Sequence, residues 1–313
     1  MQTILGANGV IGVGLAKSLV HFTDKIRLVS RNPRNVNQND ETLAADLTNA
    51  EETDFAVEGS TVAYLTVALP YKTNIWRRTW PAVMKNVIEA CKKHGAKLVF
   101  FDNVYAYGRV EGWMTEETPI CPVSRKGEVR AQIAAMLMGE VIKGNLEAQI
   151  VRSADFYGPG ARTSVVNFMV FENLGKGKRA QWLGDDRVKH SLTYAPDAAK
   201  ATAVLGNSEK AYNQVWHLPT DKNALTGKQF IELAAREFGI EPRYRVLKEW
   251  MMRAAGFLNP LARESVEMLY QNNSEYLFDS DKFGRAFEFK TTTYEQGIKE
   301  TVSSLETKKG WTL

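Results

Sequence analysis

Three glycines near the start of the chain, Gly6, Gly9 and Gly12, have a spacing that can bind a phosphate group. A short, mostly apolar run at 3–5 precedes them, and a helical pattern of apolar residues begins at Val10. A strand, a glycine turn and a helix in this order present backbone N–H groups and the positive end of the helix dipole to an anion. The first glycine lets the chain turn tightly, the second lets the backbone approach a pyrophosphate, and the third lets the helix pack closely on the strand. The pattern predicts a dinucleotide-binding turn, in preference to a turn that is glycine-rich for structural reasons alone.

The residues at the end of the second predicted strand indicate which dinucleotide is bound. An acidic residue at this position commonly accepts a hydrogen bond from the ribose 2′-hydroxyl of NAD. This chain has Ser30-Arg31 there, and Arg34 three residues further on. A guanidinium pairs well with a 2′-phosphate, which favours NADP over NAD as the cofactor. The alternative is that both arginines only decorate a solvated loop.

Strand and helix patterns alternate along the first half of the chain. Strands are predicted at 2–5, 25–30, 42–47, 61–67 and 96–101, with helices at 10–21, after Pro81 and after Pro122. This alternation predicts an α/β fold on a doubly wound parallel sheet, with ligands beyond the carboxyl ends of the strands. From about residue 155 the rhythm changes, and later helices are predicted at 227–238, 260–271 and 294–305. The two halves are expected to pack as one body, with a cleft that could hold a small-molecule substrate.

The composition restricts the class of protein further. The 313 residues are 44% hydrophobic and 24% charged with a net charge of +4, which is ordinary for a soluble globular protein. No lysine–arginine block predicts nucleic-acid binding, and no apolar run approaches the roughly 20 residues that span a membrane. The two cysteines and four histidines lack metal-ligand spacing, so no metal site is predicted. Few cysteines, and a strand that begins at residue 2 or 3, favour a cytoplasmic protein without a signal peptide.

Several motifs along the chain resemble those of one family. The turn at 6–12 resembles the GxxGxxG of the extended short-chain dehydrogenases, the NAD-dependent epimerase/dehydratase family. The further matches are Ala45-Asp46-Leu47, Tyr64-Leu65-Thr66-Val67, Val104-Tyr105-Ala106-Tyr107-Gly108, Arg152-Ser153-Ala154-Asp155-Phe156-Tyr157-Gly158-Pro159-Gly160 and Asp197. The resemblance implies a Rossmann-type domain of 1–155 plus about 195–215. It also implies a smaller C-terminal α/β substrate domain of about 156–194 and 216–313.

The glycine turn, the strand ends and this resemblance together define the predicted cofactor site. Its residues are Gly6, Asn8, Gly9, Val10, Ile11, Gly12, Ser30, Arg31, Arg34, Asp46, Leu47, Leu65, Thr66, Val67 and Asp155. Asp46 resembles the acid that lies beside the adenine. Members of the family commonly form dimers through the two long helices of the first domain, so the resemblance also implies a possible homodimer.

The catalytic positions depart from the family pattern. The resemblance implies a serine or threonine, followed by YxxxK, in which the tyrosine is the acid/base and the lysine lowers its pKa. Counted from Gly108, the serine position is Asn103, and the helix that should carry YxxxK has Lys126 and Arg130 at its two positions. No tyrosine occurs from 108 to 156. Such a chain resembles the atypical members of the superfamily, which keep the fold and the cofactor turn without these active-site residues.

Three hypotheses about the chemistry remain open. In the first, Lys126 transfers the proton, because the positive charge of Arg130 one helical turn away and burial both lower its pKa. Asn103 could then still donate a hydrogen bond to a substrate oxygen. In the second, Tyr105 at the strand end replaces the missing tyrosine. In the third, the hydride machinery is lost and the chain binds a dinucleotide as a sensor or scaffold. For Lys126 by itself, the alternative to a functional role is an ordinary solvated lysine of the helix.

The leading functional interpretation is an NAD(P)-binding, epimerase/dehydratase-like or reductase protein that acts on a small polar carbonyl or hydroxyl substrate. The alternative is a non-catalytic NADP-binding regulatory or sensor protein.

Residues of several segments are predicted to line the substrate site. They are Tyr71, Asn74, Trp76, Tyr157 and His190, and the two tyrosines are also weaker candidates for the missing acid/base. The stretch 69–80 after the fourth strand is aromatic and basic. Within it, Trp80 stands four residues after Trp76 and is expected to lie in a buried helix stripe.

A second departure concerns the substrate class. In sugar-nucleotide enzymes of the family, an arginine–aspartate pair stands shortly before the position of Asp197, and its arginine holds the diphosphate. Here those positions are His190 and Ser191. The resemblance to sugar-nucleotide enzymes is therefore weakened, unless Arg187 or Lys189 takes over the phosphate contact.

Overall fold

The computed structural model describes residues 1–309, with side chains through residue 306, and divides the chain into two compact units. The first unit comprises Met1–Gly108, Ile120–Ser153 and Ala198–Leu218, and the second comprises Arg109–Pro119, Ala154–Asp197 and the chain from Pro219 onward. The sequence prediction places 109–119 in the first domain. These residues belong instead to the second unit, because strand β6 (Trp113–Met114) pairs in parallel with strand β15 (Leu277–Phe278).

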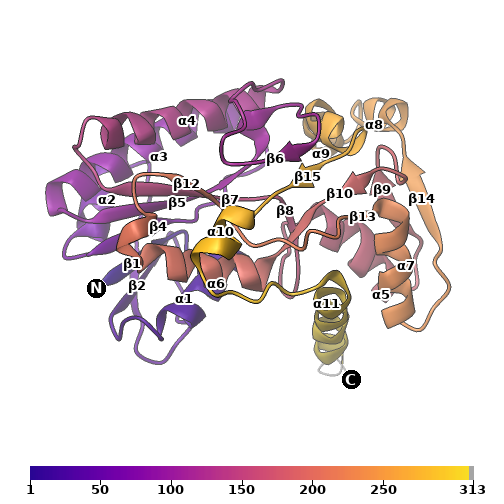
Figure 1. The fold of residues 1–313 in the computed structure, drawn as a ribbon, viewed down its shortest axis with the longest axis horizontal. Coiled ribbons are helices and arrows are strands. Elements are labelled where there is room, and N and C mark those ends of the chain that lie inside the picture. The colour runs from indigo at the N-terminus through magenta and orange to yellow at the C-terminus, as the bar shows by residue number, and fades with distance from the viewer. Residues whose placement is uncertain (310–313) are drawn as a thin grey trace. The chain divides into compact units, whose positions relative to one another are not determined.

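A seven-stranded parallel sheet forms the centre of the first unit (Figure 1). Its strands are β1 (Gln2–Leu5), β2 (Ile26–Ser30), β3 (Glu41–Ala44), β4 (Val62–Leu65), β5 (Lys97–Asn103), β7 (Ala148–Ser153) and β12 (Val215–His217). They are arranged in the order β12-β7-β5-β4-β1-β2-β3. Every residue of β1 and β4 is buried, as expected for central strands that are covered on both faces. The sheet confirms the predicted doubly wound α/β fold.

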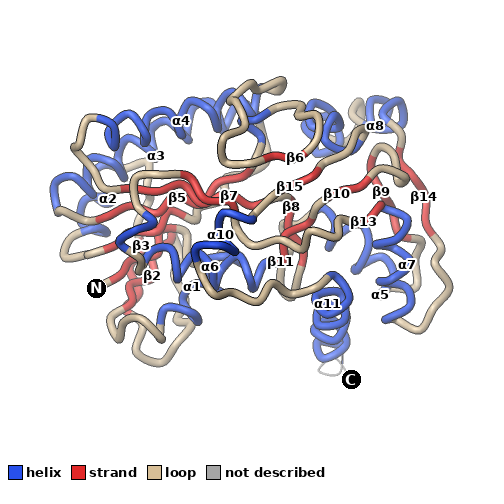
Figure 2. Tube along the Cα trace, viewed as in Figure 1, coloured by secondary structure: helices blue, strands red, loops and turns tan. Residues whose placement is uncertain are grey.

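Helices cover both faces of this sheet. They are α1 (Val10–Leu19), α2 (Ala50–Val57), α3 (Thr73–His94), α4 (Arg125–Ile142) and α6 (Ala195–Gly206), with short 3₁₀ helices η1 (Tyr105–Tyr107) and η3 (Glu209–Ala211). In Figures 1 and 2, α2, α3 and α4 lie on one face, and α1 and the part of α6 in this unit lie on the other. The helices α1 and α6 pack closely, since a Cβ atom on Gly14 would lie 2.7 Å from the Cβ of Ala199.

Helix α3 begins at Thr73, eight residues before Pro81, so the prediction that a helix starts after this proline is wrong. A proline inside a helix removes one backbone hydrogen bond and crowds the preceding turn. The apolar stripe that contains Trp76, Trp80 and Val83 runs through the proline and is buried. Burial of this stripe against the sheet stabilises the helix despite the proline. Both tryptophans are buried, as predicted for Trp80.

The second unit contains short strands, paired two by two, and short helices. The strands are β6, β8 (Asp155–Tyr157), β9 (Ala180–Leu183), β10 (Lys189–His190), β11 (Leu192–Tyr194), β13 (Leu225–Thr226), β14 (Tyr244–Leu247) and β15. The helices are η2 (Asn167–Phe171), α5 (Glu172–Gly175), α7 (Gly227–Glu237), α8 (Glu249–Ala255), α9 (Pro260–Ser265), η4 (Val266–Asn272), α10 (Asp281–Ala286) and α11 (Tyr294–Lys309). The helix predicted at 260–271 is therefore two segments, of which the second is a 3₁₀ helix.

An aromatic core holds the second unit together. Tyr157 is buried there, with its ring close to those of Phe171, Phe230 and Tyr294. Burial raises the pKa of the Tyr157 hydroxyl well above its ordinary value, with the nearby tyrosine hydroxyls adding to the shift. This residue, a candidate for substrate binding, therefore lies where it serves the packing of the core.

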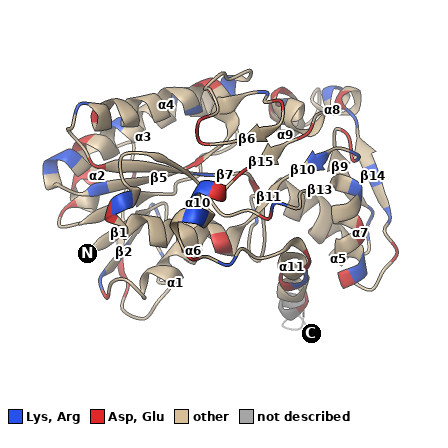
Figure 3. Ribbon diagram, in the orientation of Figure 1, with Lys and Arg blue, Asp and Glu red and all other residues tan. Residues whose placement is uncertain are grey.

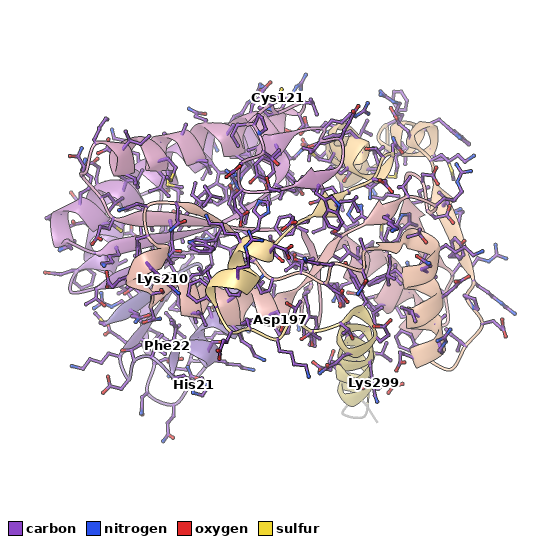
Figure 4. The ribbon with its side chains drawn as sticks, viewed as in Figure 1. His21, Phe22, Cys121, Asp197, Lys210 and Lys299 are labelled. Atoms are coloured by element: carbon purple, nitrogen blue, oxygen red, sulfur yellow. The ribbon has the colours of Figure 1, made fainter. Side chains whose placement is uncertain are left out.

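Asp197, in the first turn of α6, is labelled in Figure 4. Its carboxylate accepts hydrogen bonds from the backbone N–H and the hydroxyl of Thr292, at 2.7 and 3.0 Å. Both residues belong to the second unit, so Asp197 fixes the segment that leads into α11. None of the helices in residues 1–309 has the length and hydrophobicity needed to cross a membrane. Within the same residues, no three His, Cys, Asp or Glu side chains are grouped to hold a metal ion.

Candidate functional site

Two glycines of the β1–α1 turn are required by the packing of the chain itself. Gly6 has a φ of +102°, and a Cβ atom there would lie 2.6 Å from the backbone of Val67, two residues after the end of β4. A Cβ atom on Gly12 would lie 2.8 Å from Ala7 Cα and from the carbonyl oxygen of Gly6. A side chain at either position would collide with backbone, so the tight turn and the close contact of α1 both need glycine.

Gly9 differs from the other two glycines, because nothing in the described chain requires it. Its φ of −73° is open to any residue, and a Cβ atom would meet only the Gly6 carbonyl oxygen, at an ordinary 3.6 Å. Gly9 is the N-cap of α1, no side chain caps this helix end, and the first turn has no acidic residue. The backbone N–H groups of the first turn and the positive helix end are thus left for an anion.

The end of β2 also carries polar groups that the described chain does not satisfy. The hydroxyl of Ser30 is buried and has no hydrogen-bond partner among the described residues. Arg31 and Arg34 are exposed, and neither forms an ion pair with a carboxylate of the described chain. The side-chain amide of Asn8 donates a hydrogen bond to the carbonyl oxygen of Asn32, in the loop after β2, at 2.7 Å.

The remaining predicted cofactor residues of the first unit lie after β3, at the end of β4 and in the first turn of α1. The Asp46 carboxylate accepts bonds from the N–H and hydroxyl of Thr48, at 2.9 and 2.8 Å. These bonds, with a smaller contribution from the charge of Arg31, lower the pKa of Asp46. The Thr66 hydroxyl lies 3.3 Å from the Leu5 carbonyl oxygen. The side chains of Leu47, Leu65 and Ile11 are buried in the first unit, whereas Val10 and Val67 are half-buried.

The side chain of Lys126, in the first turn of α4, is completely buried. Its ammonium donates to the hydroxyl of Thr73 at 3.0 Å and lies 4.5 Å from the centre of the Tyr71 ring. Helix α4 is capped by the Ser124 hydroxyl, which accepts from the N–H of Gly127 at 3.0 Å. The prediction of a solvated lysine is therefore wrong, and Lys126 interacts with groups of its own protein.

The second predicted cation of this helix, Arg130, is held in an ion-pair network. Its Nε donates to Asp102 at 2.7 Å, and Arg152 donates to the other oxygen of the same carboxylate at 3.1 Å. Burial disfavours the charge of Arg152, but Asp102, with Tyr107, outweighs this effect and raises its pKa. The rings of Trp80 and other aromatic residues enclose the Arg130 guanidinium, which lies 4.5 Å from the Trp80 ring centre.

The Arg130 network connects directly to the other two candidate catalytic residues. Asp102 accepts a bond from the backbone N–H of Asn103 at 2.8 Å, and the Asn103 side-chain oxygen accepts from the N–H of Tyr105 at 3.0 Å. Asn103 and Tyr105 are half-buried, at the carboxyl end of β5. The Asn103 amide nitrogen donates to no acceptor in the hydrogen bonds found over the described residues. Asn103 and Tyr105 thus lie together, and the buried carboxylate of Asp102 holds the backbone of Asn103.

The aromatic stretch at the start of α3 contributes mainly to packing. Trp76 is buried and donates from its indole nitrogen to the Pro70 carbonyl at 3.1 Å. Its ring stacks with Tyr105, with centres 6.3 Å apart, and meets Tyr71 edge-on at 5.7 Å. Asn74 is exposed, and its side-chain oxygen accepts the N–H of Ile75.

A separate polar pair lies in the second unit. His190 is buried, and its Nε2 lies 3.1 Å from the carboxylate of Asp155, whose side chain is 37% exposed. The imidazole stacks on Tyr276 with ring centres 4.3 Å apart, and its Nδ1 has no partner among the described residues. Hydrogen bonding and ring stacking thus fix the position of the His190 ring inside the second unit.

Sequence reasoning missed Asp102, Arg152 and Thr73, which hold the candidate catalytic residues. Two signals were available. Asp102 immediately precedes Asn103, and Arg152 begins the motif that ends in Gly160. The pairing of Arg130 with Asp102 had no local signal, because 28 positions separate the two residues.

A parallel sheet with a glycine turn after β1 defines a Rossmann-type, dinucleotide-binding class of protein. The chain belongs to the NAD dependent epimerase/dehydratase family, whose sequence model matches residues 3–216, more than half of the chain. A search of curated protein sequences found no significant match.

Solved structures of sugar-nucleotide enzymes are similar in fold to the whole chain. A double mutant of dTDP-glucose 4,6-dehydratase from Streptomyces venezuelae, with NAD bound, has 15% identity and a TM-score of 0.82, covering 99% of this chain and 98% of that chain. UDP-glucuronic acid 4-epimerase from Bacillus cereus, with NAD, has 16% identity and a TM-score of 0.80, covering 98% and 99%. UDP-glucose 4-epimerase from Thermus thermophilus, with NAD, has 17% identity and a TM-score of 0.79, again covering 98% and 99%.

Proposed function

We propose that this protein is an NADP-dependent oxidoreductase or epimerase-like enzyme that acts on a small polar carbonyl or hydroxyl substrate. The observation that carries the proposal is Gly9, a glycine that the chain does not need for its own packing or backbone conformation. A missing side chain beside an uncapped helix end is explained by a ligand that approaches the backbone closely. Membership of the NAD dependent epimerase/dehydratase family supports a dinucleotide as this ligand.

The preference for NADP rests on the end of β2. Arg31 and Arg34 are exposed cations without ion pairs in the described chain, so they are available to a 2′-phosphate. The buried hydroxyl of Ser30, which has no hydrogen-bond partner among the described residues, is a further group for the ribose or its phosphate. The similar structures named above hold NAD, and titration of both cofactors therefore decides this part of the proposal.

We assign the proton transfer to Tyr105. Among the four candidate residues, Tyr105 and Asn103 are half-buried, whereas Lys126 and Arg130 are buried. A bound nicotinamide would supply or accept the hydride. The Tyr105 hydroxyl would donate a proton to the substrate oxygen in reduction and take it back in oxidation, while the Asn103 amide donates a hydrogen bond to that oxygen.

Arg130 and Lys126 are positioning residues in this proposal. The guanidinium of Arg130 fixes Asp102, whose carboxylate holds the backbone of Asn103 and thereby the turn that carries Tyr105. The Lys126 ammonium donates a hydrogen bond to the Thr73 hydroxyl and lies over the Tyr71 ring. It thereby holds the start of α3 in place against α4. Neither cation needs to touch the substrate for these roles.

The Asp155–His190 pair supports a substrate without a diphosphate. The partly exposed Asp155 carboxylate accepts one bond from His190, and no donor in the described chain occupies its second oxygen. A carboxylate held in this way can accept a hydrogen bond from a hydroxyl or amino group, and its negative charge repels a phosphate. We therefore assign to Asp155 a binding position of the second unit for a hydroxyl or amino group, although the sequence predicted it as a cofactor residue.

The test is turnover of NADPH by the pure protein with a library of small aldehydes, ketones and keto sugars. Tyr105→Phe is expected to lower kcat by at least about a hundredfold, the range of general acid catalysis. Tyr244→Phe is the matched control, because its hydroxyl bonds Asp186 in the second unit and is expected to leave kcat unchanged.

A non-catalytic NADP-binding sensor is the second candidate. It is favoured by the hydrogen bonds of Lys126 and Arg130 to residues of their own unit, which give both cations a structural role without any catalytic step. NADPH binding without turnover on any substrate of the library, in the wild type and in Tyr105→Phe alike, would support it. Homodimerisation through α3 and α4 stays a prediction, which the mass of the protein in solution tests.

A further inference from the structure

A row of buried polar residues crosses three neighbouring strands of the first unit near their carboxyl ends. Asp102 of β5 pairs in register with Arg152 of β7, which pairs in turn with His217 of β12. The three residues are 1%, 3% and 0% exposed. By contrast, the central strands β1 and β4 contain no lysine, arginine, aspartate or glutamate and are tan in Figure 3. Because burial of polar groups costs free energy unless they are paired, the partners of this row indicate its role.

His217 is the last residue of β12 and the outer end of the row. Its Nε2 forms a hydrogen bond of 2.7 Å with the hydroxyl of Tyr107, and the two rings meet edge-on with centres 5.7 Å apart. Tyr107 is buried as well. The guanidinium of Arg152 lies 4.7 Å from the centre of the same tyrosine ring. Two members of the row therefore hold the side chain of Tyr107.

Tyr107 ends the 3₁₀ helix η1 that Tyr105 begins. Two backbone hydrogen bonds close this turn. The N–H of Tyr107 donates to the carbonyl of Val104 at 3.0 Å, and the N–H of Gly108 donates to the carbonyl of Tyr105 at 3.3 Å. In so short a turn, a shift of the Tyr107 backbone also moves Tyr105.

The start of η1 is anchored by the other end of the row. The Asp102 carboxylate accepts the N–H of Asn103, whose side-chain oxygen accepts the N–H of Tyr105. Arg152 joins the two anchors, because its Nε donates to Asp102 at 3.1 Å while its guanidinium lies over the ring of Tyr107. Tyr105 thus lies between two anchors that belong to one buried network.

Helix α4 and the segment before it hold the backbone of η1 from a further side. A Cβ atom on Gly127 would lie 2.5 Å from the carbonyl oxygen of Tyr105, so α4 approaches the turn closely. The N–H of Cys121 donates to the carbonyl of Ala106 at 3.1 Å. The turn is therefore a rigid support, as a group that transfers a proton requires, since a displacement of about 1 Å can cost a hundredfold in rate.

We propose that His217 is a positioning residue for Tyr105 and acts on it through Tyr107. The proposal rests on the assignment of proton transfer to Tyr105 made above. His217 needs no contact with substrate or cofactor in this role. Its ring fixes the Tyr107 hydroxyl, Tyr107 fixes the end of η1, and η1 holds the Tyr105 hydroxyl in place for the substrate oxygen.

Turnover of NADPH in a double-mutant cycle tests this proposal. Tyr107→Phe removes only the hydroxyl and is expected to lower kcat about tenfold, with the KM for NADPH unchanged. In a Tyr105→Phe background, the same change is expected to lower the residual kcat less than about twofold, because the group that is positioned has been removed. His217→Leu is expected to behave like Tyr107→Phe. His217→Gln retains a side chain that forms hydrogen bonds and is expected to keep most of the wild-type kcat.

Tyr212→Phe is the matched control. It also removes a buried tyrosine hydroxyl of the first unit, which donates to the carbonyl of Gly206 at 2.7 Å, and it is expected to leave kcat unchanged. Thermal unfolding shows whether the variants that are compared are folded. A loss of kcat that Tyr107→Phe shows only when Tyr105 is present, and that the control does not show, supports the proposal. Equal losses in the two backgrounds, or a wild-type kcat in folded Tyr107→Phe, overturn it.

A second measurement does not depend on turnover. In protein with isotope-labelled tyrosine rings, the nuclear magnetic resonance signal of Tyr105 is identified by its loss in Tyr105→Phe. Tyr107→Phe and His217→Leu are expected to shift this signal, and Tyr212→Phe is expected to leave it in place. A Tyr105 signal that neither of the first two variants moves overturns the positioning role. If no substrate is turned over, the proposed function fails, and these signals alone decide whether His217 holds the turn.

Discussion

Two regions of the first unit use polar and charged groups in opposite ways. In the glycine turn and the adjoining end of β2, the N-terminus of α1 is uncapped, the Ser30 hydroxyl has no partner, and Arg31 has no ion pair in the described chain. In the region between β5 and α4, Lys126 and Arg130 are buried and bonded to residues of the same unit. The first region has groups available for a ligand, and the second uses its groups to hold its own structure.

This difference shows where recognition is built into the chain. A buried hydroxyl without a partner, such as that of Ser30 among the described residues, is costly in an empty protein, and a bound ligand would explain it. Buried cations that share one carboxylate are explained by the fold alone, since breaking such a pair is strongly destabilising. We therefore expect changes in the first region to affect binding, and changes in the second region to affect stability first.

The largest expected effect is the loss of stability in Asp102→Asn. This change leaves Arg130 and Arg152 buried without their common carboxylate, which is expected to lower the free energy of unfolding by about 3–5 kcal/mol. Urea unfolding followed by circular dichroism measures it. Asp54→Asn is the control, because its carboxylate is partly exposed, pairs with the exposed Lys93 and contacts His94, and its loss is expected to matter far less. Equal losses in the two variants would remove the distinction between the regions.

The next largest effect is expected for Gly6→Ala, within the glycine turn. The φ of +102° and the backbone of Val67 at 2.6 Å from the added Cβ make any side chain there strained. A loss of about 1–3 kcal/mol in the free energy of unfolding is expected. Gly95→Ala is a useful comparison, because that glycine also has a positive φ but would meet nothing within 4 Å. If both variants lose the same stability, the close approach to β4 has no energetic role.

A smaller effect is expected for Arg31→Gln and Arg34→Gln, and it concerns binding only. Loss of one charge-assisted hydrogen bond to a 2′-phosphate is expected to weaken NADPH binding about tenfold and to leave NADH binding nearly unchanged. Stability should not change, because neither arginine has an ion pair in residues 1–306. Calorimetric titration of both cofactors is the measurement. Equal or tighter binding of NADH by the wild type would refute the NADP preference.

Much of the fold could be predicted from the sequence, because its signals are local. The run 61–67 is almost wholly apolar, as a strand buried on both faces must be, and it contains β4. The glycine spacing at 6–12 likewise placed a turn between β1 and α1, where the structure has it. The start of α3 could not be read in this way, because burial of Trp76 and Trp80 against the sheet outweighs the local effect of Pro81.

The candidate site was less predictable, because it depends on contacts between distant segments. Arg130 lies at the position of a catalytic lysine, and only the folded chain brings Asp102 and Arg152 to it from two other strands. Nothing in the helix that begins at Arg125 indicates that the side chain of Lys126 is completely buried. Likewise, the stacking of His190 on Tyr276 joins residues that are far apart in the sequence.

The central claim is that binding of a dinucleotide, and not the fold, requires a glycine at position 9. Calorimetric titration of NADPH into Gly9→Ala, together with its thermal unfolding, tests this claim most directly. We predict that the unfolding temperature equals that of the wild type, whereas NADPH binds at least about tenfold more weakly, because the added methyl group would hinder the approach of a pyrophosphate to the backbone. A Gly9→Ala variant that binds NADPH as tightly as the wild type would contradict the account.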